Sequence, residues 1–250
     1  MAIYLKKFET QAAYEAAESS LILPNVSLAV DNNTVHYNPS TPPTPSHDFV
    51  EIGGVKWATM NVGANSITDY GLYFQWGDTQ GYTASQVGSG EGQKYFGWED
   101  YKYATNVQSS SADMTKYNYT DGKTVLDASD DAVIANWGGQ WRMPTTAEFQ
   151  ALGNAVNTAW TASYQGSGVA GLVCTDKIDS SKVLFFPAAG RCLNGSVRNV
   201  GSNGFCWSSS LDSGHVQYAY YLFFNSSNAG WGNYGSRYCG FHVRGVLAEN

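Results

Sequence analysis

Residues that could do acid–base or metal chemistry are few and scattered in this 250-residue chain. Of the four histidines, His36 and His47 fall in its N-terminal part, and the four cysteines form no Cys-x-x-Cys pair and have no histidine at metal-ligand spacing. A Gly-x-Ser-x-Gly nucleophile elbow is absent, and the glycines of 88–92 are not followed by the Lys-Ser/Thr of a phosphate loop. We therefore expect no catalytic residues, no cofactor, no metal ligands, and cysteines that are reduced and unpaired.

Three carboxylates lie close together at Asp127, Asp130 and Asp131. Carboxylates at the start of a helix interact favourably with the helix dipole, and this is our preferred interpretation. Carboxylate oxygens are also calcium ligands, so a structural calcium ion is left open.

Residues 191–250 have the composition of a binding surface. They contain eleven aromatic residues, nine Gly, nine Ser and seven Asn, no Lys, and only two acids, Asp212 and Glu249. Aromatic rings supply contact area at low entropy cost, and Ser, Gly and Asn supply adaptable hydrogen bonds, as in antibody loops. A tyrosine-rich β surface without a ligand would have the same composition.

The alternation over 215–224 predicts a strand with two different faces. The face expected to fill the core carries Val216, Tyr218, Tyr220, Leu222 and Phe224. The face expected to be wet and to carry aromatic anchors has His215, Gln217, Ala219, Tyr221 and Phe223. A strand buried on both sides is the alternative. Around it we predict core positions at Trp207 and Phe241, a polar loop over 225–239, and an Arg244 that binds a buried carboxylate or carbonyl groups.

The N-terminal part reads as an appendage followed by a linker. An Ala-rich helix is expected over 10–19, and two β-type runs around Asp31-Asn32-Asn33 predict a hairpin. Four of the seven prolines then fall in residues 38–46, which predicts an extended spacer. The predicted organisation is an attachment segment over 1–38, a Pro-rich linker over 39–48, and one domain over 49–250.

Local signals within the domain predict its elements. Phe49–Ile52 and Val55–Met60 should pair as strands, and a long loop should occupy 77–118. Short helices are expected over 130–136 and after the Thr145/Glu148 capping box, the second ending near Gly153. Val183–Phe186 should be a short buried strand, with only strands and loops after Ala189.

Charge and hydropathy argue against several partners. The net charge is -7 without a basic run, so nucleic acid is not an expected partner. No apolar stretch reaches the ~20 residues that cross a bilayer, so we expect no membrane insertion. The N-terminus lacks the apolar core of a secretory signal, which predicts synthesis in the bacterial cytoplasm or a chain that begins after its signal.

Seven blocks occur in an order that resembles the Fibrobacter succinogenes major paralogous domain family. They are Val55–Ala58, Asn61–Ala64, Phe74–Asp78, Asn136–Thr145, Phe186–Gly190, Trp207–Ser210 and Gly240–Arg244. That family is similar to the C-type lectin fold, which formylglycine-generating enzymes also use. The resemblance implies an α+β, C-type lectin-like domain of the formylglycine-generating-enzyme-like subtype, carrying the small N-terminal helix and β-hairpin appendage.

Some members of this class look like variable proteins of diversity-generating retroelements, in which template adenines are copied randomly. Such positions do not become Lys, Met or Trp. Residues 191–250 contain no Lys and no Met, and they hold three of the four cysteines. The resemblance implies a variable region over about 190–244. Its predicted ligand-binding residues are Arg191, Leu193, Arg198, Phe205, Cys206, His215, Tyr221, Phe223, Gly230, Gly232, Tyr234, Gly235, Ser236, Tyr238, Cys239 and His242.

Residues 7–28 resemble the leading segment of phage tail proteins, which implies attachment to a virion tail, with a homotrimer left open. The implied function is a phage receptor-binding protein whose ligand is a cell-surface protein or glycan. A bacterial surface or fimbrial adhesin is the alternative. A third alternative is an enzyme of the formylglycine-generating type. Those enzymes use a pair of cysteines, and Cys206 and Cys239 could imitate that pair.

Overall fold

The computed structural model describes residues 27–31, 34–38 and 47–248. The chain divides into two units, residues 1–46 and 47–250. In the first, β1 (Ser27–Asp31) and β2 (Thr34–Asn38) pair antiparallel, which confirms the predicted hairpin. The helix expected over 10–19 and the prolines of the linker lie outside the described residues.

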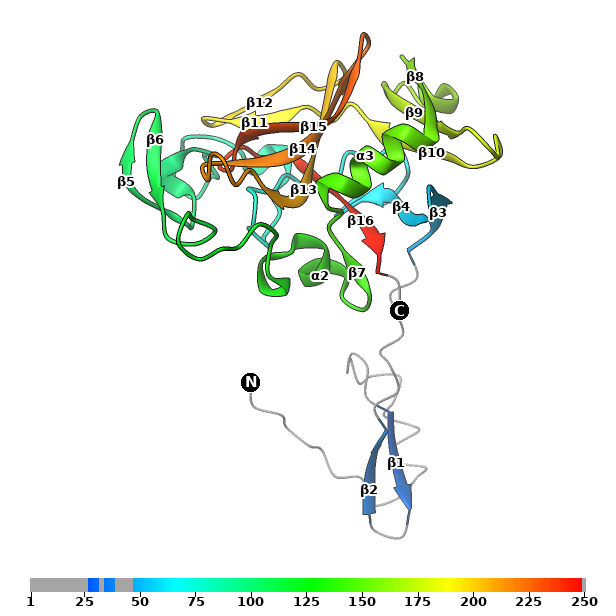
Figure 1. The fold of residues 1–250 in the computed structure, drawn as a ribbon, viewed down its shortest axis with the longest axis horizontal. Coiled ribbons are helices and arrows are strands. Elements are labelled where there is room, and N and C mark those ends of the chain that lie inside the picture. The colour runs from blue at the N-terminus through cyan, green and yellow to red at the C-terminus, as the bar shows by residue number, and fades with distance from the viewer. Residues whose placement is uncertain (1–26, 32–33, 39–46, 249–250) are drawn as a thin grey trace. The chain divides into compact units, whose positions relative to one another are not determined.

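The second unit is a mixed α+β domain, built mostly of strands with few helices (Figure 1). Its main sheet has seven strands, of which β13 and β16 are parallel and the other pairs antiparallel. In sheet order they are β15 (Ala229–Ser236), β14 (Tyr218–Asn225), β13 (Asn203–Leu211), β16 (His242–Leu247), β4 (Val55–Asn61) and β3 (Phe49–Ile52), with β7 (Trp141–Arg142) beside β16. The predicted strand pair at 49–60 is thus confirmed. In the described part of the chain, no helix has the length and apolar character needed to cross a bilayer.

Two helices are set by local capping signals. In α2 (Ala132–Trp137), the Asp131 carboxylate accepts hydrogen bonds from two backbone N–H groups of the first turn. In α3 (Thr146–Ala155), the predicted capping box between Thr145 and Glu148 is present. The end predicted at about 151–154 is met to within one residue, since the helix continues to Ala155, but Gly153 is not its terminator. Gly153 instead provides space for Trp231, whose ring would lie 2.6 Å from a Cβ at that position.

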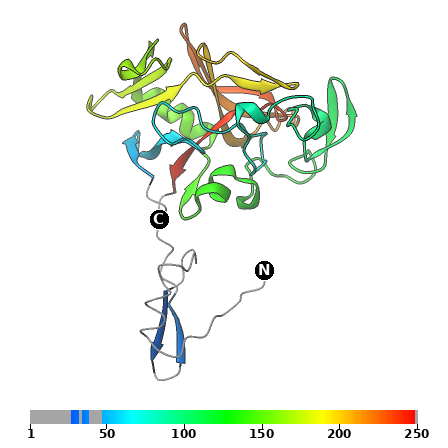
Figure 2. The ribbon, with the colours of Figure 1, turned by 180° about the vertical axis from the view of Figure 1, so that it is seen from behind.

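Three smaller sheets accompany the main one in this domain. They are the three-stranded β8 (Val156–Thr161), β9 (Gly171–Asp176) and β10 (Val183–Pro187), and the hairpins β5 (Ala104–Gln108)–β6 (Ser111–Met114) and β11 (Arg191–Leu193)–β12 (Ser196–Arg198). Two of them, the β8–β10 sheet and the β5–β6 hairpin, lie at opposite ends of the domain (Figure 2). The short buried strand expected at 183–186 is confirmed as β10. The loop expected over 77–118 is wrong in part, because it contains the β5–β6 hairpin, and 3₁₀ turns at Ala84–Gln86 and Trp98–Asp100.

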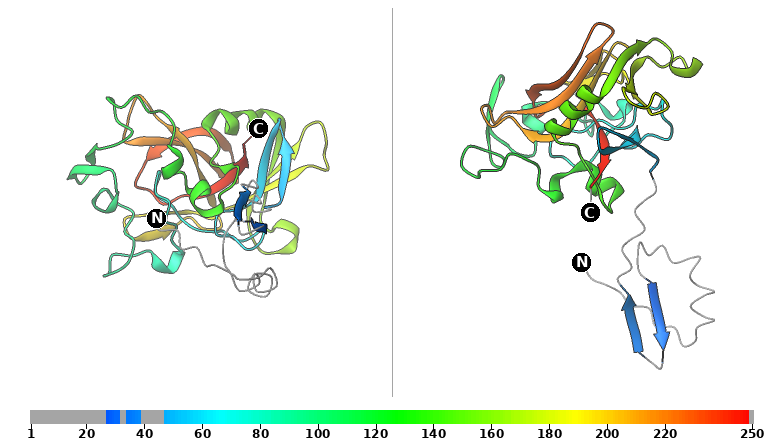
Figure 3. Two further views of the ribbon diagram at one scale, coloured as in Figure 1. Left: turned by 90° about the horizontal axis from the view of Figure 1, so that it is seen from below. Right: turned by 45° about the vertical axis from the view of Figure 1, so that its right-hand side comes forward.

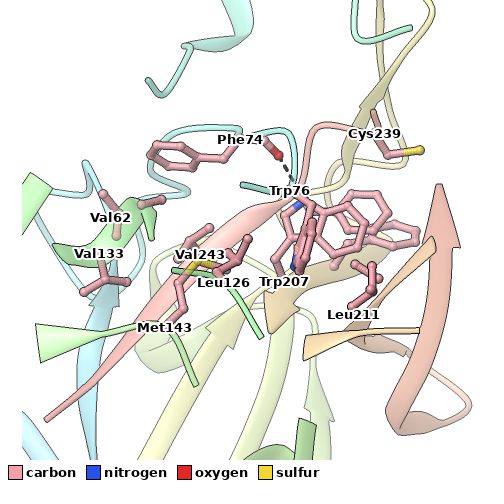
Figure 4. Close-up of a cluster of buried hydrophobic side chains, with 14 of the residues drawn as sticks. Val62, Phe74, Trp76, Leu126, Val133, Met143, Trp207, Leu211, Cys239 and Val243 are labelled. Carbon is pink, nitrogen blue, oxygen red and sulfur yellow. Dashed lines mark hydrogen bonds between the residues drawn. The ribbon is translucent and has the colours of Figure 1, made fainter. Parts of the chain in front are cut away.

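Two hydrophobic clusters cover the two sides of the sheet. One is built around Trp76, Trp207 and Phe241 (Figure 4), where the Trp207 indole donates a hydrogen bond to the Phe74 carbonyl at 3.0 Å. The other lies beneath α3 and contains Trp57 along with Phe149, Leu222 and Phe224. The predicted core positions at Trp207 and Phe241 are confirmed, with exposed fractions of 0% and 1%.

Two fully buried arginines join distant segments. The Arg244 guanidinium donates to the Asn61 side chain and to two backbone carbonyls, which confirms the prediction of buried acceptors. Arg237 donates through Nε to the Tyr101 hydroxyl at 2.8 Å, and through its Nη atoms to the carbonyls of Lys116, Tyr117 and Val216. Its guanidinium also lies 4.8 Å from the Trp76 ring. Arg237 therefore fixes the connection between β15 and β16.

Replacing Arg237 with Lys should lower the free energy of unfolding by about 3 kcal/mol, because an ammonium cannot reach all four acceptors and leaves buried carbonyls unsatisfied. Urea unfolding of the two proteins measures the change. The matched control is Arg198→Lys in β12, where the side chain is exposed and the same substitution should cost under about 0.5 kcal/mol. Equal effects of the two substitutions would contradict this role of Arg237.

Candidate functional site

Strand β14 carries both a fixed and a partly exposed set of side chains. Leu222 and Phe224 are buried in the cluster beneath α3, with exposed fractions of 0% and 1%. Tyr221 and Phe223 point to the other side and are half-buried against the cluster of Trp207. The predicted alternation is confirmed for these four residues, but Tyr221 and Phe223 pack more closely on the core than a fully wet face implies.

We call the half-buried set Arg191, Leu193, Tyr221, Phe223 and Tyr238 the display face. Its members come from β11, from β14 and from the turn after β15, and four of them pack on one core cluster. The Tyr221 ring lies 4.8 Å from Phe241 and 5.7 Å from Trp207. The hairpin of β14 and β15 projects from the body of the domain (Figure 3).

The predicted residues His215 and Tyr234 belong to a second group, the tyrosine cluster, with Tyr218 and Tyr220. In β14 and β15, Tyr220 pairs with Tyr234, and directly opposed residues of antiparallel strands point to the same side. The Tyr234 ring lies 5.8 Å from Tyr218 and 6.3 Å from both Tyr220 and His215, and Tyr234 is 54% exposed. The tyrosine cluster therefore lies on the opposite side of β14 from the display face. The prediction that Tyr218 and Tyr220 fill the core is wrong, since both are only half-buried.

Four predicted binding residues are buried, so the expectation that they are exposed is wrong. Phe205, Cys206, Cys239 and His242 have exposed fractions of 5%, 3%, 5% and 2%. Cys206 and His242 are register partners in β13 and β16, central strands that are covered on both faces. Phe205 lies beneath the display face, with its ring centroid 5.2 Å from that of Phe223.

All four cysteines are free and buried in this structure, in agreement with the expected unpaired state. Burial raises the pKa of the Cys206 and Cys239 thiols to about 12. A thiol with so high a pKa is protonated at neutral pH, unlike a cysteine nucleophile.

The remaining predicted residues lie along the edges of the two surfaces. Arg198 is exposed and pairs with Arg191 across the β11–β12 hairpin. On β15, a Cβ at Gly235 would lie 3.1 Å from the Tyr221 ring, whereas one at Gly232 would face α3. Gly230 is the register partner of Phe223, and Ser236 that of Tyr218. The polar loop predicted over 225–239 is wrong for residues 229–236, which form β15.

A pocket of about 380 Å³ borders the display face and was not foreseen from the sequence. Its walls come from the β5–β6 hairpin, from the preceding 3₁₀ turn and from the display face itself. They consist of Tyr95, Trp98, Glu99, Val107, Gln108, Ser109, Asn194 and Tyr238. Trp98 and Tyr238 meet edge to face at 4.6 Å. Tyr238 was predicted as a binding residue, but all the others except Asn194 lie in a Gly- and Tyr-rich stretch without periodicity, where no sequence signal marked them.

The acidic cluster near α2 has structural partners. Asp131 caps α2, which confirms the helix-start interpretation for this residue. Asp130 forms ion pairs with Lys102 and Lys116. Although burial opposes it, hydrogen bonds from Lys116 and neighbouring tyrosines hold the pKa of Asp130 well below its usual range. Over the described ranges, no group of three or more His, Cys, Asp or Glu side chains is arranged to hold a metal ion.

No protein family, curated protein or solved structure matches this chain in comparisons of sequence and fold.

Neighbouring phenylalanines of β14 give a direct test of the two faces. Phe224→Ala should lower the free energy of unfolding by about 3 to 5 kcal/mol, because it opens a cavity in the core. Phe223→Ala should cost about 1 to 2 kcal/mol, because the ring is half-buried. Chemical denaturation of both variants measures the difference, and an equal loss would show that β14 is core on both sides.

His242 should make stability depend on pH. Burial lowers its pKa to about 4 from 6.5, so between these values the unfolded chain binds a proton that the folded chain excludes. This contribution to stability is present above pH 6.5 and is lost as the pH falls towards 4, by up to about 3 kcal/mol.

Urea unfolding at several pH values measures the slope, and His242→Gln should have a shallower slope over this window than the parent protein. Identical slopes would contradict the assignment of a buried, neutral imidazole.

Proposed function

We propose that this chain is a ligand-binding protein of the retroelement-diversified type, which presents replaceable side chains on a C-type lectin-like scaffold. The proposal joins the resemblance of residues 49–248 to the α+β domain described above. Within the proposal, the display face and the tyrosine cluster are the two surfaces that contact the ligand.

One observation carries the proposal: Tyr221 and Phe223 are large, half-exposed aromatic side chains resting on a fixed core. Half-exposed aromatic rings are the typical anchors of protein interfaces, because they gain contact area without a large loss of rotamer freedom. Their neighbours are small, since Gly230 and Gly235 face them from β15. Larger or smaller side chains at these positions would change the surface while Trp207 and Phe241 keep their packing.

Affinity would come from a few anchors supported by a rigid frame. Arg237 fixes the turn that carries Tyr238, and the Trp207–Phe241 stack at 4.2 Å supports Tyr221. A preorganised surface loses little entropy on binding, which favours affinity. Several copies on one particle would add avidity to contacts that are individually weak.

The site of attachment distinguishes the phage from the cell-surface form of the proposal. The segment that resembles phage tail proteins, residues 7–28, lies almost wholly outside the described residues. The homotrimer stays a prediction. We retain virion attachment as the proposal and a bacterial adhesin as its alternative. The cysteine-based enzyme has no support from Cys206 or Cys239, whose thiols are buried and have a raised pKa.

A library experiment tests whether the display face can be diversified. Leu193, Tyr221, Phe223 and Tyr238 are randomised together, and the library is selected for binding to a defined protein such as lysozyme. We expect folded variants to be common and binders with affinities in the micromolar range or better, as for adaptable loops on a rigid scaffold.

The matched library randomises Trp207, Leu222, Phe224 and Phe241, which are buried, and should yield almost no folded protein. If the display-face library folds no more often than the core library, the proposal is wrong.

The DNA beside the gene gives an independent test. A reverse-transcriptase gene and a near-copy of the 3′ end that differs only at adenines are expected, and their absence would reject the retroelement origin.

A further inference from the structure

The only cation of the display face, Arg191, has unused hydrogen-bonding capacity. Its guanidinium lies over the Phe205 ring at 5.2 Å, and the side chain is half-buried. The Nε atom is inaccessible to water and has no hydrogen-bond partner. None of the ion pairs among the described residues includes Arg191. A buried donor without a partner is costly. Because Nε is inaccessible, a ligand would meet the guanidinium through its Nη groups, which are not among the buried atoms.

The closest recorded neighbours of the Arg191 side chain are aromatic. Burial raises the pKa of Tyr221 and of Tyr238, and the nearby positive charge of Arg191 opposes this rise in both. The single acid within 191–248 is Asp212. Its carboxylate is engaged by His215 and by the backbone of its own turn. Glu99 lines the neighbouring pocket with Tyr238, but no carboxylate of the described residues forms an ion pair with Arg191.

We propose that Arg191 binds the carboxylate of an Asp or Glu side chain presented by a protein ligand. The inference rests on the proposed function and names the chemistry that the display face recognises. A guanidinium offers parallel N–H donors that match a carboxylate in a bidentate pair. The Tyr221 and Tyr238 side chains are close enough to Arg191 for its charge to oppose the rise that burial causes in their pKa values.

A protein ligand fits this surface better than nucleic acid or a free anion. Phosphate backbones are bound by many cations, whereas the display face has one and the chain has a net charge of -7. The aromatic residues around Arg191 are spread over β11, β14 and the turn at Tyr238, so a partner must cover a wide area to contact them. Wide surfaces of Tyr, Ser, Gly and Asn with occasional Arg are typical of protein recognition by antibodies.

A titration that needs no natural ligand tests the carboxylate site. The full-length chain is observed by NMR at its arginine Nε–H signals while blocked tripeptides Tyr-Glu-Tyr and Tyr-Gln-Tyr are added. We expect a saturable shift of the Arg191 signal, with an apparent Kd about tenfold lower for the Glu peptide than for the Gln peptide. The Arg142 signal is the internal control, since its guanidinium already donates to the Glu148 carboxylate and should not saturate.

Substituting Arg191→Lys keeps the charge but removes the paired donors, so the preference for the Glu peptide should fall several-fold. Circular dichroism verifies that the Arg191→Lys variant is folded. If the variant is unfolded, the titration of the unsubstituted chain decides the test. Equal shifts with both peptides, or equal responses of Arg191 and Arg142, would overturn the carboxylate site. Tighter binding of glucuronate than of the Glu peptide would overturn the assignment to a protein ligand.

The outcome is independent of the test of the proposed function. A selective titration combined with a display-face library that fails to fold would reject the proposed function and retain an anion site. A folded, productive library without selectivity in the titration would retain the function and reject the role of Arg191.

Discussion

The buried guanidinium of Arg237 is the interaction on which the turn beside the display face depends. It donates to the Tyr101 hydroxyl and to three backbone carbonyls from separate parts of the chain. Burying a cation is favourable only when its donors are satisfied, and here carbonyl dipoles and aromatic rings perform that task. Because Arg237 lies between Ser236 and Tyr238, this network fixes the end of β15 and the start of the turn at the same time. The neighbouring side chains of Ser236 and Tyr238 are thereby held in place, although they form none of the hydrogen bonds of Arg237.

Alternate side chains of β14 differ in burial because the two faces of the sheet are covered differently. Leu222 and Phe224 complete the core beneath α3, whereas Tyr221 and Phe223 lie on top of a core that Trp207 and Phe241 already close. The same strand therefore carries side chains that the fold requires and side chains that it tolerates. Arg191 illustrates the second kind, since it stacks on Phe205 and yet leaves a dehydrated donor without a partner. A surface assembled in this way gains specificity from residues whose replacement costs little stability.

Local signals in the sequence predicted the elements that depend on neighbouring residues. The Thr145/Glu148 capping box and the alternation over 221–224 involve short-range geometry, and both are present. Non-local packing explains the errors. Gly153 does not end α3, because Trp231 from β15 occupies the space above it. Strand β15 was missed since its glycines have low strand propensity and its pairing with β14 is set by register. Cys206 and His242 were expected on the surface because the resemblance placed them among the variable positions, and no local signal shows that β13 and β16 are covered on both faces.

The central claim is that replaceable and required side chains interleave in residues 191–243. Saturation mutagenesis of each position, with resistance to proteolysis as the measure of folding, tests this claim most directly. The account predicts that most substitutions at Arg191, Tyr221, Phe223, Tyr234 and Tyr238 leave a resistant protein. Most substitutions at Cys206, Trp207, Leu222, Arg237 and Phe241 should abolish resistance. A chain equally intolerant at both sets of positions would contradict the account, because no surface would then be free to vary.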